Sequence, residues 1–394
     1  MKEKLTTRKF LKEKLTRKLL EGGKSVHGIN TSFAHQVPLL ASQLIKNHFR
    51  FFVVTMSECD LCRRLIGNQP FHVLELYSGI GGTAFAIESI KLPLDIKLTS
   101  VEIHPVANSV HAANFPSSKI LQRNITSLSV EECDELSANL WTMSPPCQPF
   151  TRQGLKKDVT DTRCDSFIHL MTKVLPKMKN PPEYLFLENV KGFEESEARE
   201  MMMETMTNLG YKFKEYLVSP VNLGIPNSRL RYYMTASRLA SESSNGVTIG
   251  LPDLLHPCPN CFELLFPSQL DCEWKFSMKS LSEYLEPEVD LRFYLTEKEL
   301  KFLQVMDLVD KHSKQSCCFT KSYCHLFQGT GSILKTENGL MRFFTPQEVS
   351  NLMCFPPHFK FPDEVTDRQR YRLLGNSVNV MTVSFILKSM FLMR

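Results

Sequence analysis

The chain has no long apolar run. In its 394 residues, no stretch approaches the roughly 20 apolar residues that a helix needs to cross a bilayer. The N-terminus shows no signal-peptide pattern, because lysines and arginines interrupt its first apolar stretch. The 12 cysteines are therefore expected to be reduced thiols. We predict a protein without membrane contact, located in the cytoplasm, with the nucleus as a second compartment.

An excess of charge of one sign is also missing. The formal net charge is +5, and residues 1–24 hold nine Lys/Arg and three Glu, which leaves about −1 for the remainder. Overall charge is therefore weak evidence for nucleic-acid binding by the main domain, and phosphate contacts there must come from a local patch. The basic stretch predicts a helix ended by Gly22-Gly23. It fits either an RNA-binding or targeting arm or a solvated extension, and we favour the extension.

The cysteine spacing does not favour a metal site. Two C-x-x-C pairs occur, Cys59/Cys62 and Cys258/Cys261, and together they hold enough thiolates for a zinc ion. Zinc ribbons, however, place their two pairs much closer together in sequence. We therefore expect free thiols and no bound metal.

From Phe71 onward, short apolar strands alternate with helical segments. The strands are predicted at 73–77, 98–103, 140–143, 184–187, 212–217 and 232–236. This alternation favours an α/β fold with a parallel sheet covered by helices on both faces. Residues 238–300 break the rhythm with Ser, Pro and Cys, which indicates a smaller inserted region. There is no internal repeat or low-complexity tract.

The first predicted strand leads into a glycine-rich turn. Ser78-Gly79-Ile80-Gly81-Gly82 precedes a helix-like stretch, and Glu102 ends the second strand. Glycines let the backbone approach a ligand closely, and an acid at this place can accept both ribose hydroxyls. The turn lacks the third spaced glycine of the dinucleotide fingerprint. It favours a nucleoside without pyrophosphate, such as S-adenosylmethionine, although a tight turn in any α/β protein is the alternative.

A cysteine lies on a proline-rich turn after the strand that ends at Met143. Three prolines in Ser144-Pro145-Pro146-Cys147-Gln148-Pro149-Phe150 restrict the backbone and remove donors. The carboxyl end of a parallel sheet is where α/β proteins bind ligands. A lone cysteine is usually a small buried hydrophobe, but this setting makes Cys147 a candidate nucleophile.

Three further residues fit chemistry on a pyrimidine. Glu188 ends another strand, and Arg229 and Arg231 have the spacing of side chains that share one face of an extended segment. A Cys147 thiolate would add to C6, while Glu188 bonds N3 and the exocyclic amine and Arg231 bonds O2. Such covalent catalysis divides a difficult step into easier ones. The alternatives without a catalytic role are that Glu188 caps a helix and that the two arginines lie on a solvent-exposed surface.

The order of these motifs resembles that of the cytosine-5 methyltransferases. The resemblance covers residues 71–394 and includes Glu188-Asn189-Val190, Arg229-Leu230-Arg231 and Gly375-Asn376-Ser377-Val378-Asn379-Val380. It implies a class I S-adenosylmethionine-dependent methyltransferase fold, Rossmann-like, with a mostly parallel seven-stranded sheet and a small target-recognition region. The implied division is a basic, partly disordered extension (1–70), a catalytic core (71–240), a recognition region (241–335) and a C-terminal return to the core (336–394).

A finer signature points to one branch of these enzymes. Cys318-Phe319-Thr320, Tyr323 and Gly329-Thr330-Gly331-Ser332 resemble the tRNA aspartate methyltransferase family. That resemblance implies a monomeric enzyme that methylates cytosine 38 in the anticodon loop of tRNA-Asp, with weak action on DNA at most. DNA cytosine-5 methylation and an inactive nucleic-acid-binding relative are the alternatives.

The resemblance also assigns roles to residues. Cys147, Glu188, Arg229 and Arg231 would be catalytic, and Cys318, Phe319, Thr320, Lys321 and Tyr323 would bind substrate. The implied cofactor contacts are Tyr77, Gly79, Ile80, Gly81, Gly82, Glu102, Ile103, Asn124, Ile125, Ser144, Pro146, Asn376, Ser377 and Val378. Two departures from the family pattern stand out: Glu102 replaces a frequent Asp, and Arg123-Asn124-Ile125 has no acid for the adenine amine.

Overall fold

The computed structural model describes residues 70–92, 94–146, 164–240, 243, 246–252 and 276–391. These residues belong to one compact unit, Cys59–Arg394. The predicted N-terminal extension, Cys147 with the rest of its loop, and both C-x-x-C pairs lie outside the described residues. Within the described part of the chain, no helix has the length and apolar character needed to cross a membrane.

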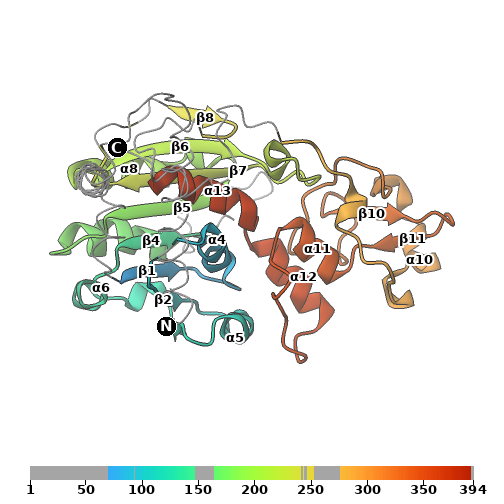
Figure 1. The fold of residues 1–394 in the computed structure, drawn as a ribbon, viewed down its shortest axis with the longest axis horizontal. Coiled ribbons are helices and arrows are strands. Elements are labelled where there is room, and N and C mark those ends of the chain that lie inside the picture. Colours follow the sequence, from blue (N-terminus) through green and yellow to red (C-terminus); the bar gives the residue numbers. More distant parts are fainter. Residues whose placement is uncertain are drawn as a thin grey trace, which may run out of the picture. The chain divides into compact units, whose positions relative to one another are not determined.

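The larger sheet of the described structure is mixed, with strand order β3-β2-β1-β4-β5-β7-β6-β8 (Figure 1). Its strands are β1 (Phe71–Leu76), β2 (Ile96–Val101), β3 (Lys119–Leu121), β4 (Leu140–Met143), β5 (Tyr184–Val190), β6 (Lys212–Val218), β7 (Arg231–Ser237) and β8 (Val247–Ile249). Only β7 runs antiparallel to its neighbours β5 and β6; the other pairs are parallel. The predicted α/β fold with a mostly parallel sheet is confirmed, and β8 adds a short eighth strand beside β6.

Both faces of the sheet are covered, as continuous apolar strands require. All six residues of β1 are buried, and alternate side chains point to opposite faces. Leu74 and Leu76 belong to the core cluster that includes α6 (Val130–Leu136), α7 (Asp165–His169) and α8 (Glu197–Asn208).

The opposite face is covered by helices from both ends of the fold. These are α4 (Gly82–Ile90) and α13 (Val380–Phe391), which pack against each other, and α13 also contacts β7 (Figure 1). Phe71 at the start of β1 meets the ring of Phe391 at a centroid distance of 5.9 Å. A further helix, α5 (Pro105–Asn114), follows β2 and begins with a proline in its first turn.

A second, smaller sheet lies between β8 and α13 in sequence. It contains β9 (Asp307–Val309), β10 (Ser332–Lys335) and β11 (Met341–Phe343), in the order β11-β10-β9. The predicted boundary at residue 335 lies between two of these paired strands, so the small sheet includes residues from both predicted regions. The neighbouring helices are α10 (Glu297–Leu300), α11 (Pro346–Leu352) and α12 (Asp367–Asn376).

A buried ion pair connects the small sheet to α11. The Arg342 guanidinium donates to both carboxylate oxygens of Glu348 at 2.7 Å each. The Glu348 carboxylate also accepts from the backbone nitrogen of Thr345, and the Thr345 hydroxyl accepts from the backbone nitrogen of Glu348. This capping box fixes the start of α11, and it gives the buried carboxylate the partners that it needs.

A second buried carboxyl lies behind the glycine-rich turn. Glu75 of β1 is 2% exposed and accepts from the backbone nitrogen of Ala84 in α4 and from the hydroxyl of Ser100 in β2. Burial raises the pKa of Glu75 to about 8 and lowers the pKa of the neighbouring His111 to about 4. Glu75 is therefore protonated at neutral pH, and it joins α4 to the first two strands as an uncharged group.

Glu75→Gln should change how stability depends on pH. The folded protein keeps the Glu75 proton until about pH 8, whereas the unfolded chain loses it near 4.5. The stability that Glu75 contributes is thus fully present below pH 4.5 and is lost as the pH rises to about 8. In urea unfolding between pH 5 and 8, the wild type should lose up to about 1.4 kcal/mol per pH unit relative to Glu75→Gln.

The exposed Glu135 provides the matched control. Glu135→Gln in α6 should leave the wild-type pH profile unchanged. The opposite contribution of His111 occurs in all three proteins and cancels in the comparison. Parallel profiles for the wild type and Glu75→Gln would contradict a protonated Glu75.

Candidate functional site

The glycine-rich turn and Glu102 meet at the carboxyl edge of the parallel strands. Glu102 follows β2, and its carboxylate accepts from the backbone nitrogens of Gly79 at 3.0 Å and His104 at 2.8 Å. Tyr77 and Gly79 both have positive φ, 58° and 52°, a conformation that is uncommon outside glycine. The turn is therefore held in a defined shape, with the acid fixed against its backbone.

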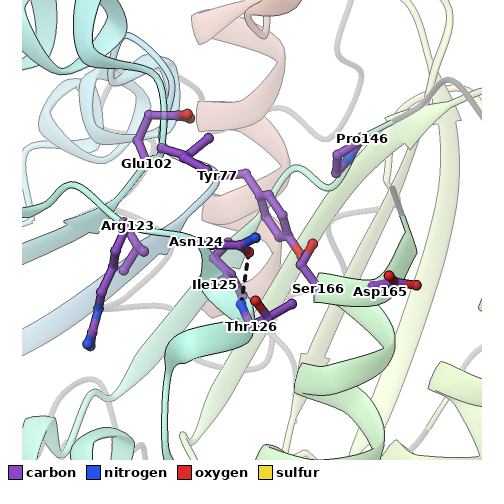
Figure 2. A pocket seen from close by; sticks show the side chains of 11 residues that line it. Tyr77, Glu102, Arg123, Asn124, Ile125, Thr126, Pro146, Asp165 and Ser166 are labelled. Carbon is purple, nitrogen blue, oxygen red and sulfur yellow. Dashed lines mark hydrogen bonds between the residues drawn. The ribbon is translucent and has the colours of Figure 1, made fainter. Parts of the chain in front are cut away.

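A cavity of about 440 Å³ opens beside this acid. Figure 2 shows the side chains that surround it, with the Tyr77 hydroxyl directed at Ser166. That hydroxyl donates to the Ser166 hydroxyl at 3.0 Å. The lining residues are Tyr77, Val101, Glu102, Ile103, Arg123, Asn124, Ile125, Thr126, Pro146, Asp165 and Ser166.

Some polar side chains in the cavity wall form hydrogen bonds with other residues of the protein. The Asn124 side-chain oxygen accepts from the backbone nitrogen of Thr126 at 3.0 Å (Figure 2). The Arg123 guanidinium bonds Glu132 of α6 at 2.9 Å. Ile103 is 61% exposed beside the cavity, while Ile125 is buried. One oriented acid and two isoleucines suit a ribose and a flat base, and this volume is typical of small-ligand sites.

Six of the residues predicted from the sequence to contact the cofactor line the cavity: Tyr77, Glu102, Ile103, Asn124, Ile125 and Pro146. The predicted Gly79, Ile80, Gly81, Gly82, Ser144, Asn376, Ser377 and Val378 are not among its lining residues. The sequence interpretation missed Asp165 and Ser166, which begin α7. They lie on a helix rather than at a strand end, so the rule that located the others gave no signal for them.

The C-terminal segment instead packs against the start of α4. A β-carbon at Gly82 would lie 2.7 Å from the Ser377 hydroxyl oxygen and 2.8 Å from a methyl of Val378. Such distances are far below ordinary contact, so only glycine allows this approach. Ser377 and Val378 therefore contact the beginning of the first helix after the turn.

A second group of polar side chains lies at the ends of β4 and β5. Glu188 is buried near the end of β5, and the Arg231 Nε lies 3.5 Å from its carboxylate. Burial raises the pKa of Glu188, against the opposing effects of Arg231, Arg229 and a hydrogen bond from Ser144. The structure thus brings together Ser144, Glu188 and Arg231 from three neighbouring strands.

Arg229 is used differently from Arg231. Its buried guanidinium donates to the carbonyl oxygens of Phe319 and Gly375, both at 3.1 Å, and to that of Ser377. It also donates to the Cys318 sulfur at 3.2 Å. Most of its donors are therefore committed to backbone, and they hold two distant segments together.

Cys318 lies between the two arginines. Its sulfur accepts from Arg229 and, at 3.7 Å, from Arg231. Burial opposes ionisation, but the two guanidiniums lower the pKa of the Cys318 thiol overall. Burial raises the pKa of four other described thiols, those of Cys133, Cys317, Cys324 and Cys354. Cys318 is the described cysteine best placed to carry negative charge near Glu188.

The remaining predicted substrate residues divide between core and surface. Phe319 and Tyr323 are 2% and 4% exposed and form part of the smaller core. The Tyr323 hydroxyl donates to the carbonyl of Ser332 at 2.7 Å. The backbone of Thr320 and Lys321 lies directly against Gly375, and the Lys321 side chain is exposed.

The site therefore combines a nucleoside-sized cavity, a carboxyl–guanidinium pair and Pro146, which lines the cavity and immediately precedes Cys147 in the chain. A family model for C-5 cytosine-specific DNA methylase matches residues 71–392. The chain belongs to that family.

Individual relatives of this methylase agree over most of the chain. The human tRNA (cytosine(38)-C(5))-methyltransferase is 35% identical over 392 residues, covering 82% of this chain and all of that protein. A DNA (cytosine-5)-methyltransferase from Dictyostelium discoideum is 34% identical and covers 81% of this chain and 94% of its own. The crystal structure of a DNMT2 variant from Spodoptera frugiperda matches with a TM-score of 0.69 and 36% identity, covering 82% and 99%. The methyltransferase fold predicted from the sequence is thereby confirmed.

Gly375→Ala should disrupt the site through a backbone clash. The added β-carbon would lie 2.2 Å from the backbone of Thr320 and Lys321, which must then move away from α12. Overpacking of this kind costs about 1–3 kcal/mol, and a 1 Å displacement near a reacting centre can lower the rate about a hundredfold. We expect the rate of methyl transfer to fall about a hundredfold. The rate is measured together with the midpoint of urea unfolding, which reports the loss of stability.

Gly210→Ala is the comparison variant for this loss. Gly210 has φ of +78° and open space around its α-carbon, so alanine there costs about 1 kcal/mol of backbone strain without a clash. Its activity should remain near that of the wild type. Full activity in Gly375→Ala would contradict a fixed contact between α12 and the Thr320-Lys321 backbone.

Proposed function

We propose that the protein transfers the methyl group of S-adenosylmethionine to C5 of cytosine 38 in the anticodon loop of tRNA-Asp. The observation that carries the proposal is the buried Glu188–Arg231 pair, located at the same sheet edge as the nucleoside-sized cavity. The similarity to the human tRNA (cytosine(38)-C(5))-methyltransferase, which extends over the whole of that protein, supports the choice of substrate.

The cavity residues suit the adenosyl part of the cofactor. Glu102 already points its carboxylate at backbone amides and has lone pairs left for a ribose diol. Ile103 and Ile125 offer apolar surface for the adenine ring. When bound, S-adenosylmethionine supplies an electrophilic methyl group. Asp165 and Ser166 provide polar atoms in the cavity wall, and this chain has no acid at 123–125, where the family pattern has one.

Glu188 and Arg231 suit a cytosine ring. Because burial raises the pKa of Glu188, its carboxyl can hold a proton toward N3 and still accept from the exocyclic amine. Arg231 can donate to O2 while it remains beside that carboxyl. Both contacts withdraw electron density from the ring, which favours thiolate addition at C6.

Cys147 is the proposed nucleophile. Its sulfur forms a bond to C6, and C5 then becomes nucleophilic and takes the methyl group. Loss of the C5 proton to a base breaks the sulfur–C6 bond and restores the thiolate. Neighbouring Pro146 is among the lining residues of the cavity, so the chain leads directly from the donor side to this cysteine.

RNA is favoured over DNA as the substrate for two reasons. A cytosine in a loop is already partly unstacked, so it costs less to extract than a paired base. The main domain carries little net charge, which suits a compact loop better than a long duplex. The Dictyostelium relative bears a DNA methyltransferase name, which keeps DNA methylation as the second candidate. An inactive relative is disfavoured because Cys147, Glu188 and Arg231 are all present.

Labelled-methyl transfer to RNA and DNA, measured side by side, tests the substrate. The RNAs are a tRNA-Asp transcript and the same transcript with uridine in place of cytosine 38; the DNA is an unmethylated duplex. We expect methyl incorporation into the unmodified tRNA-Asp transcript only, because the site requires a cytosine that can be unstacked at a low cost in free energy. Incorporation into DNA alone would overturn the proposal.

Cys147→Ala should reduce methyl transfer to background. The variant removes the only group proposed to attack C6, while Glu188, Arg231 and the cavity residues stay in place. With a tRNA-Asp transcript containing 5-fluorocytosine at position 38, which cannot lose a C5 proton, the wild type should form an adduct that survives denaturing gels. Cys133→Ala, at a buried thiol in α6, should retain adduct formation. An active Cys147→Ala enzyme would rule out the covalent mechanism.

A further inference from the structure

Two phenylalanines form a stacked pair at the surface of the small-sheet region. Phe302 follows α10 and Phe327 follows Tyr323 in the chain; their ring centroids are 5.0 Å apart, with an interplanar angle of 27°. Phe302 is 48% exposed, and neighbouring Leu326 is 55% exposed. We call Phe302, Phe327 and Leu326 the aromatic platform. Large apolar groups that remain in water next to each other often mark a binding surface.

The aromatic platform is separate from the core of this region. That core is formed by Phe319, Tyr323 and Phe344, whose rings meet edge to face at 4.9 and 5.1 Å. All three are at most 4% exposed. The platform rings stack nearly parallel instead, and Phe302 keeps about half of its surface in solvent. Packing of the small sheet therefore does not account for its exposed face.

One continuous segment joins the aromatic platform to the candidate site. It begins at Cys318, between Arg229 and Arg231, and ends at Phe327. Contacts along its length fix its position: the Thr320-Lys321 backbone lies against Gly375, and the Leu326 carbonyl accepts from the Thr330 hydroxyl. Nine residue steps can span at most about 30 Å. A macromolecule with its reacting group at Glu188 can thus also reach the platform.

Cationic side chains flank the aromatic platform. Lys301 immediately precedes Phe302, and Lys321 lies on the connecting segment; both are exposed. Neither forms an ion pair with another residue in the described part of the chain. The adjacent acid Glu299 is occupied by the capping box that it makes with Thr296. Exposed aromatic faces with free cations nearby are the features by which proteins bind unpaired nucleotides.

We propose that the aromatic platform stacks an unpaired base of the RNA substrate other than the target cytosine. The proposal rests on the proposed function for the identity of its occupant, and it adds a second point of contact. Stacking on aromatic rings is tolerant of base identity, because every base has a flat face. The platform would therefore raise affinity and orient the loop without selecting a sequence.

Substitutions that separate ring stacking from apolar character test the proposal. Phe302→Leu and Phe327→Leu keep a hydrophobic side chain but lose the ring, whereas Phe302→Trp keeps a flat face. With the tRNA-Asp transcript, each leucine variant should raise the KM for RNA about tenfold. The kcat at saturating RNA, the KM for S-adenosylmethionine and the Tm should stay within error of the wild type. Phe302→Trp should restore the wild-type KM.

A direct signal and a surface control complete the experiment. The same transcript with 2-aminopurine in the anticodon loop should show fluorescence quenching on binding to the wild type and less quenching with Phe302→Leu. Ile249→Ala removes an 84% exposed side chain from β8, away from the aromatic platform in sequence and sheet, and should change none of these values.

The outcomes distinguish this inference from the proposed function. If the wild type methylates the transcript and the leucine variants keep its KM and quenching, the platform proposal is wrong while the proposed function stands; a protein partner would then be the better occupant. If the wild type methylates DNA alone, the proposed function is wrong, and unchanged RNA binding by Phe302→Leu in the same titration overturns the platform as well. A drop in Tm together with kcat would assign Phe302 a structural role and also overturn it.

Discussion

The arrangement of the site depends on one buried cation. The Arg229 guanidinium donates to the carbonyls of Phe319, Gly375 and Ser377, which lie up to 148 residues away in sequence. Hydrogen bonds from a charged donor such as this one each contribute about 1.5–3 kcal/mol. Through this one side chain, the start of β7 is joined to the Cys318 segment and to the C-terminal segment that contacts Gly82. Arg229 therefore fixes the position of the cofactor side of the site, near Gly82, relative to the substrate side, near Cys318.

Three carboxyl groups near the sheet edge illustrate how environment divides their roles. Glu102 accepts two backbone N–H groups beside the cavity. Glu188 is buried, which raises its pKa, but it has Arg231 beside it. Glu75 is 2% exposed beside a histidine whose own pKa is lowered, and burial raises the pKa of Glu75 to about 8. The same functional group thus serves as an oriented acceptor, a candidate ring contact and a neutral structural link.

Local patterns in the sequence were sufficient to predict the sheet and part of the site. Apolar runs identified β1, β2, β4 and β5, and the carboxyl ends of parallel strands share one edge, so Glu102 and Glu188 could be placed together in advance. What could not be predicted depends on contacts between distant segments. Nothing near Arg229 indicates that its acceptors lie in residues 319–377. Ser166 reaches the cavity because α7 packs against the short 3₁₀ helix Ile125–Ser127, which is distant in sequence. The Phe302–Phe327 pair likewise brings together residues from two separate segments, neither of which has the periodicity of a regular element.

The contact of α13 with strands β1 and β5 has a consequence for biosynthesis. The face of β1 that carries Phe71 and Val73 is closed by a helix that ends at Phe391, whose ring also meets Tyr184 of β5. During translation, this apolar face stays exposed to water until α13 has been synthesised, because contacts between residues distant in sequence form late. A chain that stopped short of α13 would leave Phe71 and Tyr184 without their partner Phe391, and exposed apolar surface of this kind makes incomplete chains prone to aggregation.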